Sequence, residues 1–236
     1  MERATTSTTG TPDDAVPIDA VTTEAAPTDR VPVDAVLYDF GNVLVGWDPA
    51  GAIREGMSAH ETERFLRADD FDFGAFNHAQ DAGRSWADAL AELARTHPHH
   101  VPAVEAYLAH FPSSLTGPVE GSAELVAELD ALGLALYGLT NWSAELFHGA
   151  EPAAPAIGRM RDVVVSGREG LAKPDPAIFE LAIARFGLDP ARTVFVDDSP
   201  SNVATAVGLG FVALLFTGTS ELRRRLRDLG VDVAPA

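Results

Sequence analysis

The residues of this 236-residue sequence that could do chemistry are polar side chains that follow a series of apolar runs. They are Asp39, Thr140, Asn141, Lys173, Asp197 and Asp198. Converging carboxylates with few nearby cations repel one another, so the set indicates a divalent cation that joins them. Mg²⁺ suits oxygen ligands, and no histidine or cysteine lies within these motifs to favour zinc.

Lys173 is the only lysine among the 17 lysine and arginine positions of the chain. An ammonium is a compact point charge, whereas a guanidinium is a wide planar fork. A point charge suits a tight site between a carboxylate and a phosphate. A lone lysine can also fall here by chance, so its significance depends on the surrounding motifs.

The combination predicts phosphoryl transfer. Asp39 would attack phosphorus and form an aspartyl-phosphate, which water then hydrolyses. The metal and Lys173 would keep Asp39 ionised and neutralise charge on the phosphoryl oxygens. The Thr140 hydroxyl and the Asn141 backbone N–H would bind those oxygens, and Trp142 would line the substrate pocket.

The acidic pair Asp197–Asp198 is expected to serve the metal. Asp198 would be a direct ligand, and Asp197 would lie either beside it or behind a water. Asn202 either assists this acidic loop or has no role in it. Acidic pairs are common at helix N-termini without any metal, so this assignment depends on the other motifs.

Apolar runs without polar alternation precede these groups and predict buried strands. They occupy residues 35–38, 135–139, 163–165, 193–196 and 211–216. Helical segments between them begin at Ser122, at Pro176 and after an N-cap at Ser199. This alternation predicts an α/β fold, a doubly wound parallel sheet with right-handed crossovers. Ligands of such sheets bind outside the carboxyl ends of the strands.

A segment with helical periodicity, residues 48–115, separates the first two strands. It is too long for one crossover helix, so it predicts a helical cap inserted into a Rossmann-like core of residues 33–47 and 116–236. Capping patterns begin at Ser58 and Ser85. The cap would cover the site. Five aromatic residues are expected to form its core, with the lining of a substrate pocket as the alternative: Trp47, Phe71, Phe73, Phe76 and Trp86. The histidines 97, 99 and 100 are expected in a solvated loop, with a metal site as the alternative.

The composition restricts the class of partner. A net charge of −18 argues against nucleic acid and anionic membranes, so we expect a small phosphorylated molecule as substrate. The arginine-rich run at 223–227 is expected near the negative end of a C-terminal helix. The absence of cysteine fits the cytoplasm, and we find neither a membrane-spanning run nor a signal peptide. Residues 1–32 have the composition of a disordered acidic tail.

Four segments, YDFGNVLV, GLTNWS, AKPDPAIF and VFVDDSPSN, resemble the haloacid dehalogenase-like (HAD) hydrolase superfamily. Most of its members are Mg²⁺-dependent phosphatases, and the resemblance runs from about residue 34 to the C-terminus. It implies that Asp39 is the nucleophile, Thr140 and Lys173 bind phosphate, and Asp198 and the Gly41 carbonyl bind the metal. Residues 48–115 resemble the helical cap that one branch of the superfamily carries. Within that branch, the motifs are most similar to those of bacterial glucose-1-phosphate phosphatases.

The chain departs from the family at Gly41, because the usual first motif has a second aspartate at this position. That aspartate protonates the leaving group and then activates water, a contribution typically of about 10²- to 10⁴-fold. One hypothesis is that the site favours leaving groups that need little protonation, such as anomeric, acyl or aryl phosphates. The other is that Asp48, His78 or Asp81 supplies the proton.

Two other functions remain open from the sequence. A carbon–halogen hydrolase of the same superfamily would use the aspartate to attack carbon. That chemistry needs no metal, so the Asp197–Asp198 pair counts against it. A non-catalytic phosphate-ligand binder is the second alternative, and Gly41 is its only support.

Overall fold

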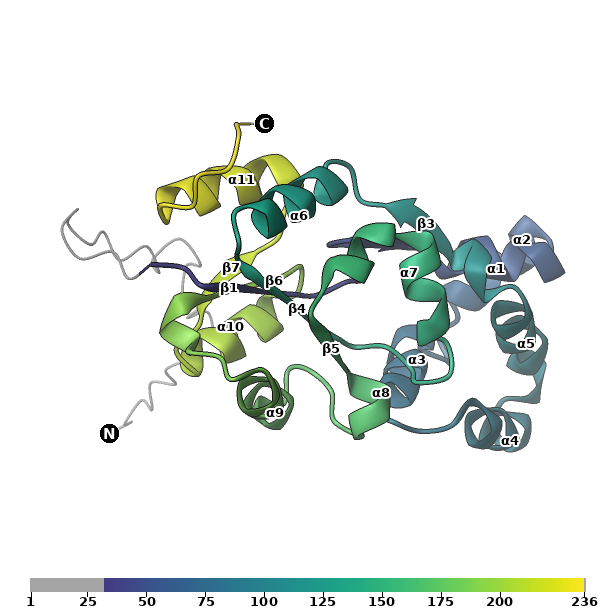
Figure 1. The fold of residues 1–236 in the computed structure, drawn as a ribbon. Coiled ribbons are helices and arrows are strands. Elements are labelled where there is room, and N and C mark those ends of the chain that lie inside the picture. The colour runs from purple at the N-terminus through teal and green to yellow at the C-terminus, as the bar shows by residue number, and fades with distance from the viewer. Residues whose placement is uncertain (1–31, 236) are drawn as a thin grey trace, which may run out of the picture. The chain divides into compact units, whose positions relative to one another are not determined.

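The computed structural model describes residues 32–235, so the predicted tail lies almost entirely outside the described residues. A parallel sheet in the order β5-β4-β1-β6-β7 runs through the centre of this region (Figure 1). Its strands are β1 (Ala35–Tyr38), β4 (Ala135–Thr140), β5 (Asp162–Val165), β6 (Thr193–Asp197) and β7 (Val212–Leu215). The doubly wound α/β prediction is confirmed.

Helices cover both faces of the sheet. One face carries α6 (Ser122–Ala131) and α11 (Thr219–Asp228), and the other carries α9 (Pro176–Phe186) and α10 (Pro200–Gly208) (Figure 1). Successive residues of β1 join the two cores: Val36 belongs to the cluster that contains Leu125, and Leu37 to the cluster that contains Phe179. A strand buried on both faces must be apolar at every position, which explains the missing alternation in the sequence.

The ends of the core helices follow their sequence signals. Helix α9 has Pro176 in its first turn, and the Asp175 side chain accepts a hydrogen bond from the Ala177 N–H. It ends at Gly187, whose φ of 64° lies in the left-handed region. Ser199 holds the N-cap position of α10 as predicted. Its hydroxyl, however, makes no bond to the helix backbone and instead pairs with the Ser201 hydroxyl.

Helices fill most of the chain between β1 and β4, and the helical part of this segment is called the cap below. They are α1 (Pro49–Gly56), α2 (Ala59–Leu66), α3 (Phe73–Asp81), α4 (Trp86–Thr96) and α5 (Val101–Ala109). The capping box of Ser58 and Glu61 begins α2, and Ser85 caps α4 by accepting from the Asp88 N–H. Phe73 and Trp86 are buried within this helical region, as expected for its aromatic residues.

The chain passes between sheet and cap on two short strands that the sequence did not reveal. β2 (Val45–Trp47) and β3 (Leu115–Pro118) pair antiparallel. Neither strand is long enough to show a period. A Cβ added to Gly46 would lie 2.1 Å from Thr116 Oγ1, so a larger residue here would displace the threonine side chain of the paired strand.

The remaining elements are short. They are α7 (Ala150–Ala153), α8 (Ser166–Glu169) and 3₁₀ turns at Pro98–His100, Phe111–Ser114, Phe147–Gly149, Pro155–Arg159 and Pro190–Arg192. Within residues 32–235, no helix has the length and apolar character needed to cross a membrane. In the arginine-rich run of α11, Arg223 is paired with Glu128, and Arg224 is paired with Glu221 and Asp228.

Candidate active site

The predicted site residues meet at the carboxyl edge of the sheet. Asp39 directly follows β1, Thr140 is the last residue of β4, and Asp197 is the last residue of β6. Lys173 lies in the loop that follows β5 and α8. Parallel strands end at the same edge of a sheet, so residues far apart in the sequence become neighbours there.

Lys173 joins two carboxylates in the interior of the protein. Its Nζ lies 2.9 Å from Asp39 Oδ1 and 2.6 Å from Asp197 Oδ2, and the lysine is only 1% exposed. Burial acts to lower the pKa of Lys173, but the two carboxylates outweigh it and raise this pKa above its ordinary value. The lysine therefore stays charged, and it bridges the two acids as a fixed cation.

Asp39 is under opposing influences. Burial raises the pKa of Asp39 to about 7, Lys173 acts to lower it, and the Asp197 carboxylate raises it further. A further cation beside Asp39 would favour the ionised form that a nucleophile needs.

Asp197 has its hydrogen-bonding capacity taken up by the protein. Its Oδ1 accepts from the Ser199 N–H at 2.8 Å, and the buried Asn202 donates to both oxygens at 2.9 and 3.1 Å. With Lys173 on Oδ2, this carboxylate orients the lysine and has little capacity left for a direct metal bond. Asn202 thus contacts the acidic loop, which was one of the two roles open from the sequence.

Asp198 is the exposed member of the acidic pair and faces Asn42. Burial and then the Asp197 charge raise its pKa, and a hydrogen bond with the Asn42 side chain acts to lower it. Asn42 has a φ of 55°, in the left-handed region, and its Oδ1 accepts from the Trp47 N–H. Carboxylate oxygens of Asp39, Asp197 and Asp198 lie within 4.8 Å of one another, a spacing that can hold a metal ion.

Thr140 offers a hydroxyl that no protein group satisfies. The residue is fully buried, and its Oγ1 has no hydrogen-bond partner within the described residues. A buried polar atom without a partner costs free energy, so it marks a place where a polar ligand can bind. Beside it, the Asn141 amide donates to the Lys173 carbonyl and accepts from the Lys173 N–H, at 2.9 and 2.8 Å, which holds the lysine loop in place.

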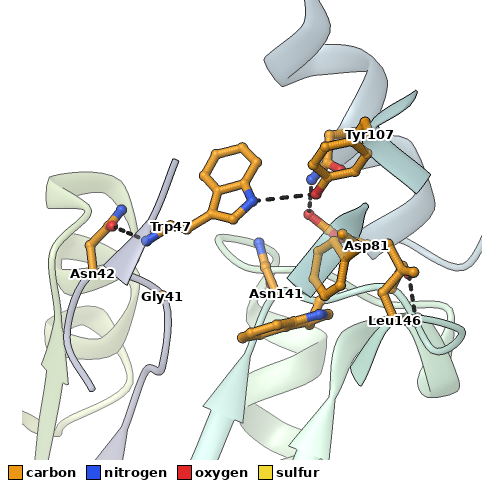
Figure 2. A pocket seen from close by; sticks show the side chains of 11 residues that line it. Gly41, Asn42, Trp47, Asp81, Tyr107, Asn141 and Leu146 are labelled. Carbon is orange, nitrogen blue, oxygen red and sulfur yellow. Dashed lines mark hydrogen bonds between the residues drawn. The ribbon is translucent and has the colours of Figure 1, made fainter. Parts of the chain in front are cut away.

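A cavity of about 150 Å³ opens between this edge of the sheet and the cap (Figure 2). Its core side includes Gly41, Asn42, Asn141, Trp142, Ser143 and Leu146, and its cap side includes Asn77, Asp81, Tyr107 and the neighbouring Trp47 and Phe111. Trp142 therefore lies where the sequence suggested. Trp47, expected in the cap core, instead lines the cavity and donates from Nε1 to the Tyr107 hydroxyl at 3.3 Å.

The position of the missing family acid faces open space. A Cβ added to Gly41 would meet no atom within 4 Å, and its φ lies outside the left-handed region. Of the alternative donors, Asp48 caps α1 by accepting from the Ala50 N–H, and His78 is exposed. Neither lines the cavity, whereas Asp81 does.

The histidine-rich segment of the cap forms a 3₁₀ turn, Pro98–His100, that contacts Asp70. His100 is buried, and its Nε2 lies 3.1 Å from Asp70 Oδ1, while His99 Nε2 lies 2.9 Å from Asp70 Oδ2. These three residues have a spacing that could hold a metal ion. The His100 ring also packs against Phe65 and Phe71, which gives it a structural role in the cap.

Comparisons with known proteins find relatives in sequence and in structure. The chain is 31% identical over 180 residues to mouse acyl-CoA dehydrogenase family member 10, a match of 72% of this chain and 16% of that protein. It is 36% identical over 84 residues to phosphoserine phosphatase of Thermus thermophilus, which covers 35% of this chain and 34% of that protein. The chain thus spans well under two thirds of either relative.

Solved structures share the fold. A HAD family enzyme of Bacteroides thetaiotaomicron, bt-2542, in complex with magnesium and inorganic phosphate, superposes with a TM-score of 0.61 at 21% identity. The match covers 79% of this chain and 95% of that one. The family model described as haloacid dehalogenase-like hydrolase matches residues 33–210, a span that holds every strand-end group of the site. The chain belongs to the haloacid dehalogenase-like hydrolases.

Proposed function

We propose that this protein is a Mg²⁺-dependent phosphatase that hydrolyses a small phosphorylated metabolite. The observation that carries the proposal is that two features occur at the same edge of the sheet: the Asp39–Lys173 ion pair and the buried Thr140 hydroxyl, which has no partner among the described residues. A phosphoryl group beside Asp39 would receive the Thr140 hydrogen bond and the Lys173 charge together.

The residues would divide the work of an aspartyl-phosphate mechanism. Asp39 would attack phosphorus, and Lys173 and Thr140 would hold the phosphoryl oxygens. Asp197 would keep Lys173 oriented through the 2.6 Å contact. The oxygen donors fit a magnesium ion, which Asp39, Asp198 and the Gly41 carbonyl would hold. When bound, the ion would neutralise charge on the phosphoryl oxygens.

The cavity supports a small substrate with polar groups on an apolar framework. At about 150 Å³ it has room for a small leaving group. Indole rings of Trp47 and Trp142 offer apolar surface, and the side-chain amides of Asn77 and Asn141 offer hydrogen bonds. A sugar phosphate matches this lining, because its ring can lie against an indole while its hydroxyls pair with the amides.

The proposal is tested by phosphate release from 4-nitrophenyl phosphate and from a panel of sugar and nucleotide phosphates. Each would be measured with Mg²⁺, with chelator and on Asp39→Asn. We expect release that needs the metal and disappears in the variant. Halide release from 2-haloacids without metal would instead support the carbon–halogen hydrolase. Tight binding of panel members without turnover would support a non-catalytic binder.

A further inference from the structure

We propose that Asp81 of the cap does the work of the acid that is missing at Gly41: it gives a proton to the leaving group and then takes one from the attacking water. This inference rests on the proposed phosphatase function. In the first motif, glycine occupies position 41, so the core offers no proton donor to the leaving group at this position. Sterics do not explain the glycine, because an added Cβ would meet nothing within 4 Å.

Asp81 is the one carboxylic acid among the described residues that line the cavity. It is the last residue of α3, and it lies across the cavity from Gly41 (Figure 2). The nucleophile, Asp39, belongs to the same loop as Gly41, and its charge acts on Asp81. In an in-line displacement the leaving group departs on the side of phosphorus opposite Asp39, and the proposal places it in this cavity. The cap therefore supplies a carboxyl group on the side where the leaving group must lie.

Hydrogen bonds hold the Asp81 carboxyl in place from both sides. On the cap, Asn77 Nδ2 donates to Oδ2 at 3.1 Å, and on the core the Ser143 backbone N–H also donates to this carboxyl. Ser143 lies three residues after the phosphate-binding Thr140, so its bond sets Asp81 relative to the phosphate site. Trp86 reinforces this docking: its Nε1 donates to the Ser143 hydroxyl at 3.1 Å and its N–H to Glu145 at 2.9 Å.

The surroundings of Asp81 favour its protonated form. Among the described residues the cavity lining contains no lysine or arginine, so no cation there holds the carboxyl ionised. The titratable groups that face it are Asp39 from the core and Tyr107 from α5. Burial, and then the Asp39 charge, raise the pKa of Asp81 to about 7, while the Ser143 and Asn77 bonds act to lower it. Burial also raises the pKa of Tyr107, which stays neutral.

Asp81 would act in both halves of the reaction. As a bond forms between Asp39 and phosphorus, the bond from phosphorus to the leaving oxygen breaks, and that oxygen takes the Asp81 proton to leave as an alcohol. In the second half, the Asp81 carboxylate takes a proton from water as the water oxygen attacks phosphorus. The Asp39–phosphorus bond then breaks, inorganic phosphate is released, and Asp81 is protonated again.

The test compares two substrates of similar size on Asp81→Asn. 4-Nitrophenyl phosphate has a leaving group that needs little protonation, whereas 4-nitrobenzyl phosphate releases an alkoxide that needs a proton. We expect kcat/KM to fall by about 10²- to 10⁴-fold for the benzyl substrate and by less than about tenfold for the phenyl substrate. Asp72→Asn is the matched control, since it removes the same charge from the N-cap of the same helix, outside the cavity, and both substrates should be unaffected.

A rescue variant sharpens the test. Gly41→Asp in the Asp81→Asn background has space for its side chain, and it should restore benzyl phosphate hydrolysis by at least about tenfold. Turnover of the phenyl substrate shows that each variant is folded. Equal losses on both substrates in Asp81→Asn, or a folded double variant with no recovery on the benzyl substrate, would overturn the proposal. A wild-type enzyme that turns over neither substrate would overturn the phosphatase function itself, and this inference with it.

Discussion

The core and cap sides of the cavity hold their acids in different ways. On the core side, Asp197 is fully buried and is held by a charged partner, Lys173. On the cap side, Asp81 is partly buried and receives hydrogen bonds only from neutral donors. A fixed cation beside a carboxyl favours its charged form, whereas Asp81 has only neutral donors and burial raises its pKa to about 7. The core can therefore supply fixed charge for the phosphoryl group, and the cap a proton that moves.

The two sides should also differ in how much a substitution lowers the stability of the protein. Removing one partner of a buried ion pair leaves an uncompensated charge in the interior, whereas a half-buried neutral acid can be replaced by an amide of the same shape. Substitutions in the buried ion pair of Lys173 should thus affect both folding and every substrate. Cap substitutions at Asp81 should affect the substrates selectively.

The largest expected effect is that of Lys173→Met. The change leaves Asp39 and Asp197 facing each other without their cation, which should cost about 3–5 kcal/mol in the free energy of unfolding. It should also lower kcat/KM by about 10³-fold or more on aryl and alkyl phosphates alike. Urea unfolding and phosphate release measure the two effects. Arg224→Met, which removes two exposed ion pairs, is the control and should change stability by less than about 1 kcal/mol.

Thr140→Val should separate activity from stability on the core side. The valine keeps the shape of the side chain and removes a buried hydroxyl that has no partner, so the unfolding free energy should stay the same or rise slightly. Activity should fall by about 10²-fold on both substrates, because one donor to the phosphoryl oxygens is lost. A clear loss of stability would show instead that the hydroxyl has a structural role.

The sheet and the core residues of the site could be predicted from the sequence because their signals are local. Uninterrupted apolar runs revealed the strands, and parallel topology brings Asp39, Thr140 and Asp197 to one edge. The different roles of the acidic pair could not be predicted in this way. Asp197 is directed to Lys173 and Asp198 to Asn42 by contacts that join distant parts of the chain.

The cavity was harder to predict because both sides of it depend on how the cap docks. Asp81, His78 and Asp48 were equal candidates for a proton donor, since nothing near them in the sequence shows which side chain faces the core. The hydrogen bond from the Ser143 N–H distinguishes Asp81 from the other two candidates. It links residues 62 positions apart in the sequence. Trp47 was placed in the cap core for the same reason, because a tryptophan at a crossing strand has no distinctive pattern.

A pH profile should distinguish the two sides of the cavity within the wild-type enzyme. A general acid works only when it is protonated, so Asp81 should be active below its pKa of about 7 and inactive above it. The ratio of kcat/KM for 4-nitrobenzyl phosphate to that for 4-nitrophenyl phosphate cancels the ionisations that both substrates share. This ratio should be flat at low pH and fall about tenfold per pH unit above about pH 7. In Asp81→Asn it should be low and independent of pH.

The smallest effect on activity is expected at the other end of the helix that carries Asp81. Asp72 begins α3 by accepting a hydrogen bond from the Ala75 N–H at 3.0 Å, so Asp72→Ala should cost about 1 kcal/mol in the free energy of unfolding. The Asn77 and Ser143 bonds lie beyond this first turn and should keep the Asp81 carboxyl in place, so the benzyl-to-phenyl ratio should not change. Urea unfolding and the two-substrate assay measure both quantities. If fraying at Asp72 lowered the ratio as Asp81→Asn does, the ratio would report the order of α3 as a whole and not proton transfer by its last residue.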